Sequence, residues 1–169
     1  MSAPRGILPL KSGKVRGFEE YFAKCIESLK VQKTKINELV IVHTNETFLV
    51  EYLNGFDFGD LPVSKHEWTK DPNFSEQVNY GVRASKSKWV SIFEFDDEYS
   101  NIWFKNVKQF EESYPEADAF LPIVVDIDDK GGFAGFTNEA TFALNISAEM
   151  GILTNDTLQT YQNFQISGM

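Results

Sequence analysis

Four acidic residues lie close together directly after an apolar stretch, in the sequence WVSIFEFDDEYS over residues 89–100. They are Glu94, Asp96, Asp97 and Glu98. Carboxylates this close repel one another and raise each other's pKa unless a cation offsets their charge. Mg2+ and Mn2+ take oxygen ligands and commonly bridge one or two carboxylates to the phosphates of a substrate. The cluster therefore indicates either a divalent metal site or a solvated strand end in which Asp97 or Ser100 caps the next helix, and the spacing alone favours neither.

A second acidic stretch, DIDDKGG at residues 126–132, also has the composition of a metal-binding loop. Read as a calcium loop, it has Lys130 at the fifth position and Thr137 at the twelfth, where a bidentate glutamate is needed. The stretch instead predicts the turn of a β-hairpin.

The histidines and the cysteine give weaker signals. His43 ends the apolar run LVIV, where a histidine is either a ligand contact or a hydrogen-bonded boundary residue. His66 has no neighbouring cysteine or histidine at the spacing of a zinc site. Cys25 is predicted to be a buried helix residue, since a single cysteine cannot form an internal disulfide. The sequence has neither a G-x-S-x-G nucleophile motif nor a P-loop.

The first half of the chain alternates predicted strands and helices. GILPLK at residues 6–11 predicts a strand that ends near Pro9. Apolar residues three and four apart over 18–29 predict a helix. The unalternating run in ELVIVHTNE, residues 38–46, predicts a strand covered on both faces. Residues 54–70 are irregular, with room for one short strand at 61–68.

Further elements follow in the second half. Asn73 and Glu76 form a capping-box-like pair that predicts a helix over 73–85. KWVSIFEF, residues 88–95, is predicted to be a central strand because it is rich in β-branched and aromatic residues. A helix from Asn101 to Tyr114 is expected to stop before Pro115, and strands are expected at 117–127 and 138–146.

These elements predict one α/β domain over residues 1–169. We expect three layers, α/β/α, with a mostly parallel central sheet and a small antiparallel hairpin in the last third. A right-handed crossover places the ends of the first two strands, near Pro9 and His43, along one edge of the sheet. Ligands of such sheets bind beyond the carboxyl ends of the strands, which is where the acids at 94–98 fall.

Composition excludes several classes of partner. The net charge of -9 and the pI near 4.7 disfavour a nucleic-acid partner. No run approaches the roughly 20 apolar residues of a transmembrane segment, and residues 1–14 lack the apolar core of a signal peptide. Together with the single cysteine, this predicts a cytoplasmic protein.

Residues 73–100 resemble the core of a family 2 glycosyltransferase with the GT-A nucleotide-sugar-binding fold, in which an Asn-x-Gly helix leads into a strand ending in D-x-D-D. Asn79 and Gly81 match the helix, Ala84 matches its end, and EFDD at 94–97 matches the strand end, with Glu94 in place of the first aspartate. Counting the upstream strands and helix, the resemblance covers roughly residues 5–125.

The resemblance implies transfer of a sugar from a nucleotide-diphosphate-sugar donor to the hydroxyl of a saccharide or other acceptor, with inversion at the anomeric carbon. It implies a divalent cation, Mn2+ or Mg2+, bound by Asp96 and Asp97. The residues expected to bind the donor are Pro9, Lys11, His43, Asn45, Asn79, Arg83 and Glu94.

The sequence also departs from the family pattern. Residues 43–45, HTN, stand where the family commonly has aspartates that contact the base. No match to the family's catalytic base occurs, so the catalytic residue is unassigned, and the chain is expected to be cut short before the acceptor half. The alternative is a non-catalytic nucleotide-sugar-binding or interaction module that keeps the fold. A nucleotidyltransferase is a weaker alternative, since it would need a glycine-rich phosphate loop that KSGKVRG, residues 11–17, matches only faintly.

Overall fold

A computed structural model describes residues 4–71, 73–120, 124–128 and 130–136. The chain divides into two compact units, residues 1–118 and 119–169, which are described separately. The expectation of a single domain stays a prediction.

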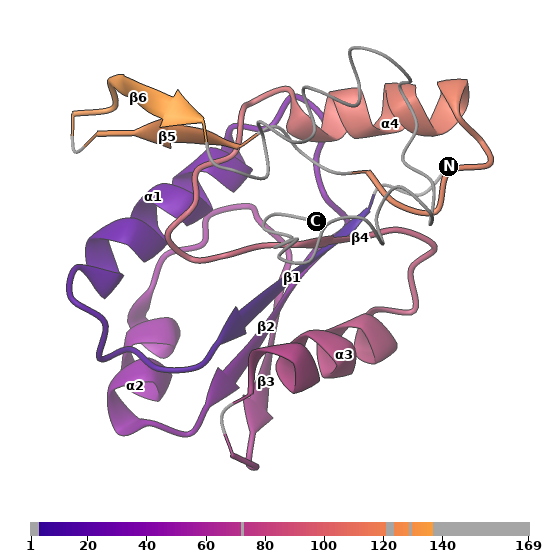
Figure 1. The fold of residues 1–169 in the computed structure, drawn as a ribbon. Coiled ribbons are helices and arrows are strands. Elements are labelled where there is room, and N and C mark those ends of the chain that lie inside the picture. The colour runs from indigo at the N-terminus through magenta and orange to yellow at the C-terminus, as the bar shows by residue number, and fades with distance from the viewer. Residues whose placement is uncertain (1–3, 72, 121–123, 129, 137–169) are drawn as a thin grey trace, which may run out of the picture. The chain divides into compact units, whose positions relative to one another are not determined.

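The first unit is built on a four-stranded parallel sheet in the order β3-β2-β1-β4 (Figure 1). The strands are β1 (Arg5–Leu10), β2 (Glu38–Thr44), β3 (Val63–Trp68) and β4 (Val90–Ile92). The helices are α1 (Phe18–Lys30), α2 (Thr47–Gly55), α3 (Phe74–Ser85) and α4 (Trp103–Ser113). The predicted α/β class and the parallel sheet are confirmed.

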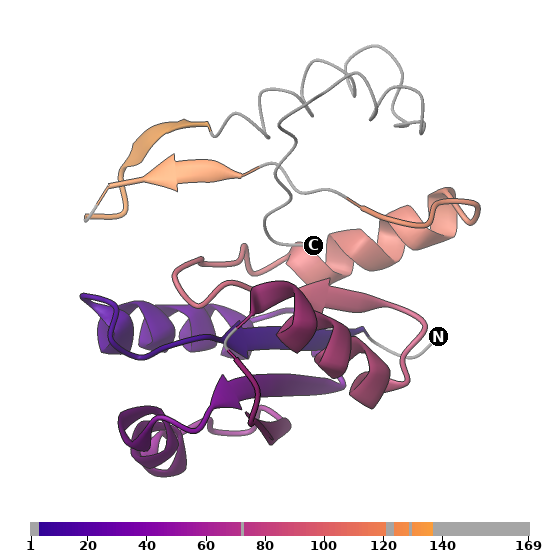
Figure 2. The same ribbon diagram turned by 60° about the horizontal axis from the view of Figure 1, so that its bottom comes forward.

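Both faces of the sheet are buried, which explains the unalternating apolar runs in β1 and β2. Leu8 and Ile41 belong to the larger core cluster, which includes Phe22 of α1. Their strand neighbours Ile7 and Val40 point to the opposite face and belong to a smaller cluster. Figures 1 and 2 show α1 and α3 on opposite sides of the sheet, so the first unit has the three layers that were expected.

Helix α3 packs unusually close to the sheet at Gly81. A Cβ atom added there would lie 2.6 Å from Cγ2 of Ile7, a fully buried residue of β1. Glycine is therefore needed at this position for packing, which is the physical reason for one residue of the Asn-x-Gly pattern.

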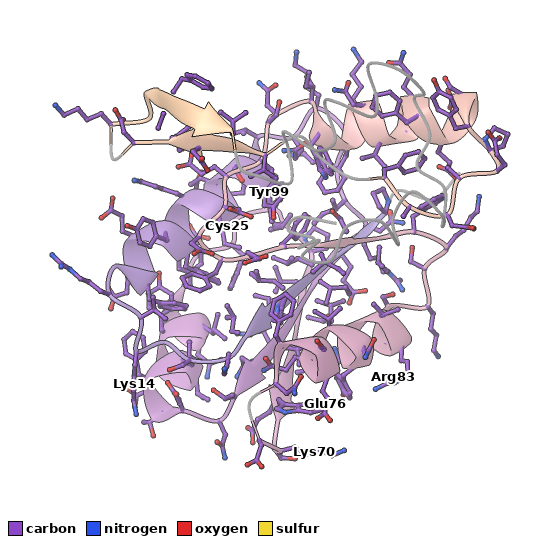
Figure 3. All side chains as sticks on the ribbon, viewed as in Figure 1. Lys14, Cys25, Lys70, Glu76, Arg83 and Tyr99 are labelled. Atoms are coloured by element: carbon purple, nitrogen blue, oxygen red, sulfur yellow. The ribbon has the colours of Figure 1, made fainter. Side chains whose placement is uncertain are left out.

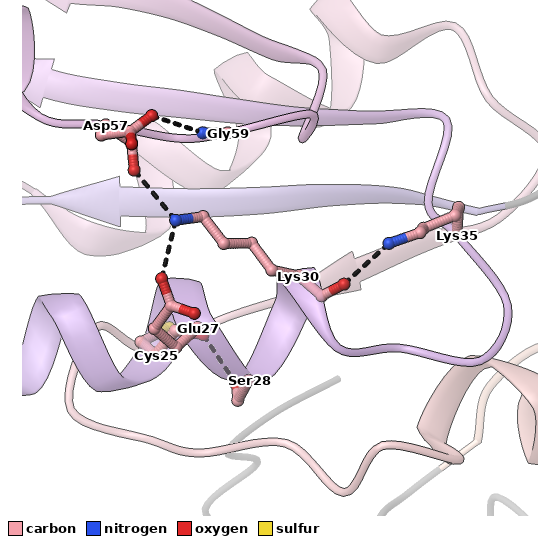
Figure 4. A network of polar contacts seen from close by, with 7 residues as sticks. All are labelled: Cys25, Glu27, Ser28, Lys30, Lys35, Asp57 and Gly59. Atoms are coloured by element: carbon pink, nitrogen blue, oxygen red, sulfur yellow. Dashed lines mark hydrogen bonds and ion pairs between the residues drawn. The ribbon is translucent and has the colours of Figure 1, made fainter.

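The end of α1 is tied to the loop that follows α2 (Figure 4). Lys30 Nζ donates to Glu27 Oε1 at 2.7 Å and to the carbonyl oxygen of Asp57 at 3.0 Å. Asp57 in turn accepts from the backbone N–H of Gly59 at 2.8 Å. This network holds the α2–β3 loop against α1.

Two expectations about the elements need correction, whereas β1 ends at Leu10, one residue after Pro9 and close to its predicted end. The nitrogen of Pro9 falls on the β4 side of β1, because Arg5 and Ile7 direct their backbone groups there, and β4 has already ended at Ile92. The missing N–H of proline therefore costs the sheet no hydrogen bond. Helix α2 occupies a stretch to which the sequence analysis assigned no element.

The expected central strand is also shorter and placed differently. β4 spans three residues, and in the described part of the chain it pairs with β1 alone and is the outer strand. It ends because the chain turns, with the N–H of Asp97 donating to the carbonyl oxygen of Glu94 at 3.3 Å. β3 and the helix over 73–85 lie close to where they were predicted.

The described part of the second unit is a β-hairpin, β5 (Val125–Ile127) and β6 (Phe133–Phe136), paired antiparallel. In its turn, Asp128 Oδ1 accepts hydrogen bonds from the N–H groups of Lys130 and Gly132, both at 2.8 Å. The hairpin interpretation of residues 126–132 is confirmed, with β6 directly after the turn. The strand expected at 138–146 lies outside the described residues.

Among the described residues, no helix combines the length and the apolar character needed to cross a membrane.

Candidate functional site

Three chain segments leave the sheet at the same edge, because β1, β2 and β4 are parallel. Leu10 of β1 is level with His43 of β2, and Ile7 is level with Ile92 of β4. The structure thus brings the segments that follow the three strands, residues 11–17, 45–46 and 93–98, to one end of the sheet. This is the end at which parallel α/β sheets bind ligands.

The loops after β1 and β2 are held together by Glu46, the N-cap residue of α2. Its carboxylate accepts from Ser12 Oγ at 2.8 Å and from the N–H of Gly13 at 3.2 Å. Gly13 is buried, and a Cβ there would lie 2.5 Å from the ring of Phe48. Lys11 is exposed beside this contact, while Pro9 is buried in the strand. The loop after β1 therefore has a fixed path with an exposed cation at its start.

His43, Thr44 and Asn45 differ in what they offer a ligand. His43 and Thr44 are buried, and His43 Nδ1 lies 2.8 Å from the carbonyl oxygen of Thr44. Because a carbonyl oxygen can only accept, Nδ1 is the donor in this contact. Asn45 is exposed at the end of the strand. Only Asn45 of the three presents its side chain to solvent.

The first turn of α3 reaches the ends of β1 and β2 through Gln77, which is fully buried. Its Nε2 donates to the carbonyl oxygen of Leu10 at 3.2 Å and to that of Val42 at 3.4 Å. These hydrogen bonds satisfy carbonyl groups near the carboxyl ends of two strands, and they fix the helix to that edge of the sheet.

Two of the predicted donor-binding residues lie farther along α3. Asn79 and Arg83 are exposed and four residues apart, so they share an outward face of the helix. Helix α3 connects two parallel strands, β3 and β4, so it runs away from the carboxyl edge of the sheet. Arg83, six residues after Gln77, therefore lies about 9 Å farther than Gln77 from that edge. Figure 3 shows Glu76 and Arg83 toward opposite ends of α3. The structure does not bring Arg83 to the other predicted residues.

The acidic turn after β4 combines exposed and partly buried carboxylates. Asp96 is exposed, whereas Glu94 and Asp97 are partly buried. The pKa of Asp97 is raised to about 6, mainly by burial and further by the negative charges of Glu94 and Asp96. The folded environment of the turn therefore disfavours the charged form of the Asp97 carboxyl group.

The helix-capping interpretation of these residues is wrong. Helix α4 begins at Trp103, and its N-cap residue, Ile102, makes no side-chain capping bond. Ser100 contributes only its carbonyl oxygen, to the N–H of Trp103 at 2.9 Å. Neither Asp97 nor Ser100 caps the helix.

Within the described ranges, no group of three or more His, Cys, Asp or Glu side chains could hold a metal ion by itself. A cation at the turn would complete its coordination with water or ligand oxygens, which is the usual arrangement of Mg2+ and Mn2+ at phosphate sites. An exposed Asp96 beside a partly buried Asp97 fits that donor set.

The parallel sheet with helices on both faces is a GT-A type α/β fold. The family model described as Glycosyl transferase family 2 matches residues 14–166, and the chain belongs to this family.

Solved structures of the same fold include Staphylococcus aureus TarS 1-349. The complex of TarS with UDP matches at a TM-score of 0.55 and 16% identity, over 76% of this chain and 37% of TarS. The complex with UDP-GlcNAc matches at a TM-score of 0.56 and 17% identity, over 78% and 36%. The chain thus spans little more than a third of the TarS chain. No curated protein sequence matches it.

Sequence reasoning missed the residues that act on main-chain groups. Glu46 and Gln77 are examples, and so are residues of α1 and of the segment after the acidic turn. Glu46 follows a predicted strand end directly, which is a usable signal. Gln77 gives none, because a buried glutamine on a helix has the same spacing as an exposed one.

Proposed function

We propose that this chain binds a nucleotide-diphosphate sugar at the carboxyl edge of its parallel sheet and serves transfer of the sugar to an acceptor hydroxyl. The observation that carries the proposal is the turn with Asp96 and Asp97. It lies at the end of β4, on the same edge as the loops after β1 and β2, and has no capping role. Membership in glycosyl transferase family 2 supports the same chemistry.

In this proposal Asp96 is the direct ligand of a divalent cation, Mn2+ or Mg2+, and Asp97 and Glu94 contribute charge or orient water. When bound, the cation would offset the negative charge that grows on the diphosphate as the glycosidic bond breaks. The raised pKa of Asp97 supports this role, because burial and the neighbouring acids Glu94 and Asp96 disfavour a charge that a cation would stabilise.

The donor would be bound by the three segments at this edge. Lys11 offers a positive charge for phosphate oxygens, and Asn45 offers an exposed amide for the nucleoside. Pro9 and His43 are buried, so they would contribute by shaping the site and not by direct polar contacts with the donor. Asn79 lies closer to the edge than Arg83, and a role for Arg83 would require a donor long enough to reach along α3.

The transfer step itself is proposed to invert the anomeric carbon. In such a step a general base takes the proton of the acceptor hydroxyl while the sugar–phosphate bond breaks. The base is not assigned to a residue of this chain.

The test is thermal melting with a panel of nucleotide diphosphates, with and without Mn2+. UDP is the first probe, because TarS structures contain UDP and UDP-GlcNAc. A ligand at 100 times its Kd adds about 2.7 kcal/mol to the free energy of unfolding, which raises Tm by several degrees for a domain of this size. We expect the largest shift with Mn2+ present. If no nucleotide in the panel shifts Tm with Mn2+, the donor-binding proposal is wrong.

Turnover separates an enzyme from a non-catalytic binding module. Nucleotide release from a bound nucleotide sugar, by slow hydrolysis or transfer, is expected for the enzyme. Tight binding without release at long incubation would favour the binding module.

A further inference from the structure

The second half of α1 contacts the main chain of the acidic turn. Cys25 Sγ donates to the carbonyl oxygen of Glu94 at 3.5 Å. Ser28 Oγ accepts from the N–H of Tyr99 at 3.0 Å, and it donates to the carbonyl oxygen of Cys25 at 2.6 Å (Figure 4). Residues 94–99 are therefore attached to α1 at both ends.

The chain just beyond the end of α1 holds the segment that follows the acidic turn. Gln32, which is buried, donates from Nε2 to the carbonyl oxygen of Ser100 at 2.8 Å. Its Oε1 accepts from the N–H of Phe104 at 3.4 Å. Cys25 and Ser28 of α1, together with Gln32 just beyond the end of the helix, thus direct polar groups at the backbone of residues 94–104.

Tyr99 closes the turn from within. Its hydroxyl oxygen accepts from the N–H of Glu94 at 3.3 Å, and its ring packs edge-on against Phe93 at 4.6 Å between centroids. Figure 3 shows Cys25 and Tyr99 close together beside α1. Burial raises the pKa of Tyr99, with smaller contributions from Cys25 and Asp97, so the hydroxyl stays neutral. The hydroxyl of Tyr99 therefore fixes the main chain before Asp96 and Asp97, and the N–H of the same residue, bound to Ser28, fixes the main chain after them.

These contacts all fall on main-chain groups, whereas the side chain of Asp96 remains exposed. That division is what a metal-binding carboxylate needs, because mutation of the groups that orient a metal ligand typically lowers metal affinity about 10- to 100-fold. A residue that only filled the core would not need a hydroxyl directed at the turn.

We propose that Tyr99, supported by Ser28, is a positioning residue that fixes the turn carrying Asp96 and Asp97 for binding of a divalent cation and a diphosphate. The inference rests on the proposed function. It adds that α1, which makes no direct contact with a ligand in this account, controls the metal-dependent part of donor affinity.

The test compares Tyr99→Phe with the unchanged protein by isothermal titration calorimetry. The Kd of UDP is measured in EDTA and again in Mn2+, and the ratio of the two gives the metal-dependent part of the affinity. Phenylalanine keeps the ring contact with Phe93 and removes the hydroxyl. We expect the ratio to fall about tenfold while the Kd in EDTA is unchanged.

Tyr52→Phe is the matched control. Tyr52 lies in the same aromatic core, and its hydroxyl donates to the carbonyl oxygen of Glu19 at 3.2 Å, away from the acidic turn. This variant loses a comparable phenol-to-backbone hydrogen bond. Its Kd ratio is expected to match that of the unchanged protein, which a purely structural effect of losing a hydroxyl would not produce.

Ser28→Ala is the second variant, and it decides the question if Tyr99→Phe does not fold. It removes the acceptor for the N–H of Tyr99 and is also expected to lower the ratio. A ratio that stays unchanged in a folded variant of either kind overturns the positioning role. If the unchanged protein binds the nucleotide diphosphates no more tightly with Mn2+ than in EDTA, the cation role of Asp96 and the positioning role are overturned together. If it binds none of them, the donor-binding proposal is overturned.

Discussion

The carboxyl group of Asp97 lies partly buried beside Glu94 and Asp96, and its pKa is raised to about 6 from an ordinary value of 3.8. At neutral pH the group is ionised in both the folded and the unfolded chain, but the folded environment disfavours the charge. The turn therefore lowers the free energy of unfolding in the absence of a cation. A carboxylate whose charge is disfavoured in the folded protein is typical of a functional site, and binding of a cation would offset that charge.

Asp97→Asn is expected to stabilise the unliganded protein at neutral pH. Because the pKa of the folded state is raised, the unchanged protein loses stability as pH rises from about 4 to about 6. The variant lacks this loss and should gain about 1 kcal/mol at pH 7, after allowance for solvent screening, and nothing near pH 4. Urea denaturation of both proteins at the two pH values measures the difference.

Glu98→Gln is the control for that experiment, since Glu98 is an exposed acid in the same turn. It should change stability little at either pH. A gain for Asp97→Asn that is equal at both pH values, or a loss at pH 7, would show that its carboxyl group is not disfavoured in the folded state.

At the residue scale, the acids were visible in the sequence because four carboxylates after an apolar run are conspicuous. The groups that hold them were not. Ser28 and Gln32 read as ordinary helix residues, since a hydrogen bond to the backbone of a segment about 70 residues away leaves no spacing pattern.

At the scale of elements, the distance between α3 and the sheet sets where the first turn of that helix lies. Gly81 allows the close approach to Ile7, and Gln77, one turn earlier, reaches the carbonyl groups of Leu10 and Val42. The packing of the helix and the geometry of the sheet edge are therefore linked.

Gly81→Ala is expected to destabilise the protein by about 1–3 kcal/mol despite the better helix propensity of alanine, because the new methyl group meets a buried side chain. Thermal melting measures the effect. Gly55→Ala, at the end of α2, is the matched control, since a Cβ there meets nothing within 4 Å. It should be neutral or stabilising by up to about 1 kcal/mol. Equal effects of the two substitutions would contradict the packing argument.

Elements were predictable where periodicity was strong. The amphipathic pattern of α1 and the apolar runs of β1 and β2 placed those elements closely. The position of β4 was not predictable, because a strand rich in β-branched and aromatic residues has the same sequence whether it lies at the centre or at the edge of a sheet. Its early end depends on the turn at residues 94–97.

At the scale of the whole molecule, the chain has a net charge of -9, and yet the ligand proposed for it is a diphosphate. The long-range field of the protein repels such a ligand, so local charge must reverse the sign at the site. Lys11 supplies part of that charge, and a cation at Asp96 would supply the rest. Nucleotide binding is therefore expected to depend on a divalent metal.

The most direct measurement is the Kd of UDP by calorimetry, with Mn2+ and with EDTA, for the unchanged protein and for Asp96→Asn. Glu112→Gln, which removes an exposed acid of α4, is the charge-matched control. The account predicts that Mn2+ tightens binding at least about tenfold in the unchanged protein and in Glu112→Gln, and that this gain is lost in Asp96→Asn. Binding that is unaffected by Mn2+, or a full Mn2+ effect in Asp96→Asn, would contradict it.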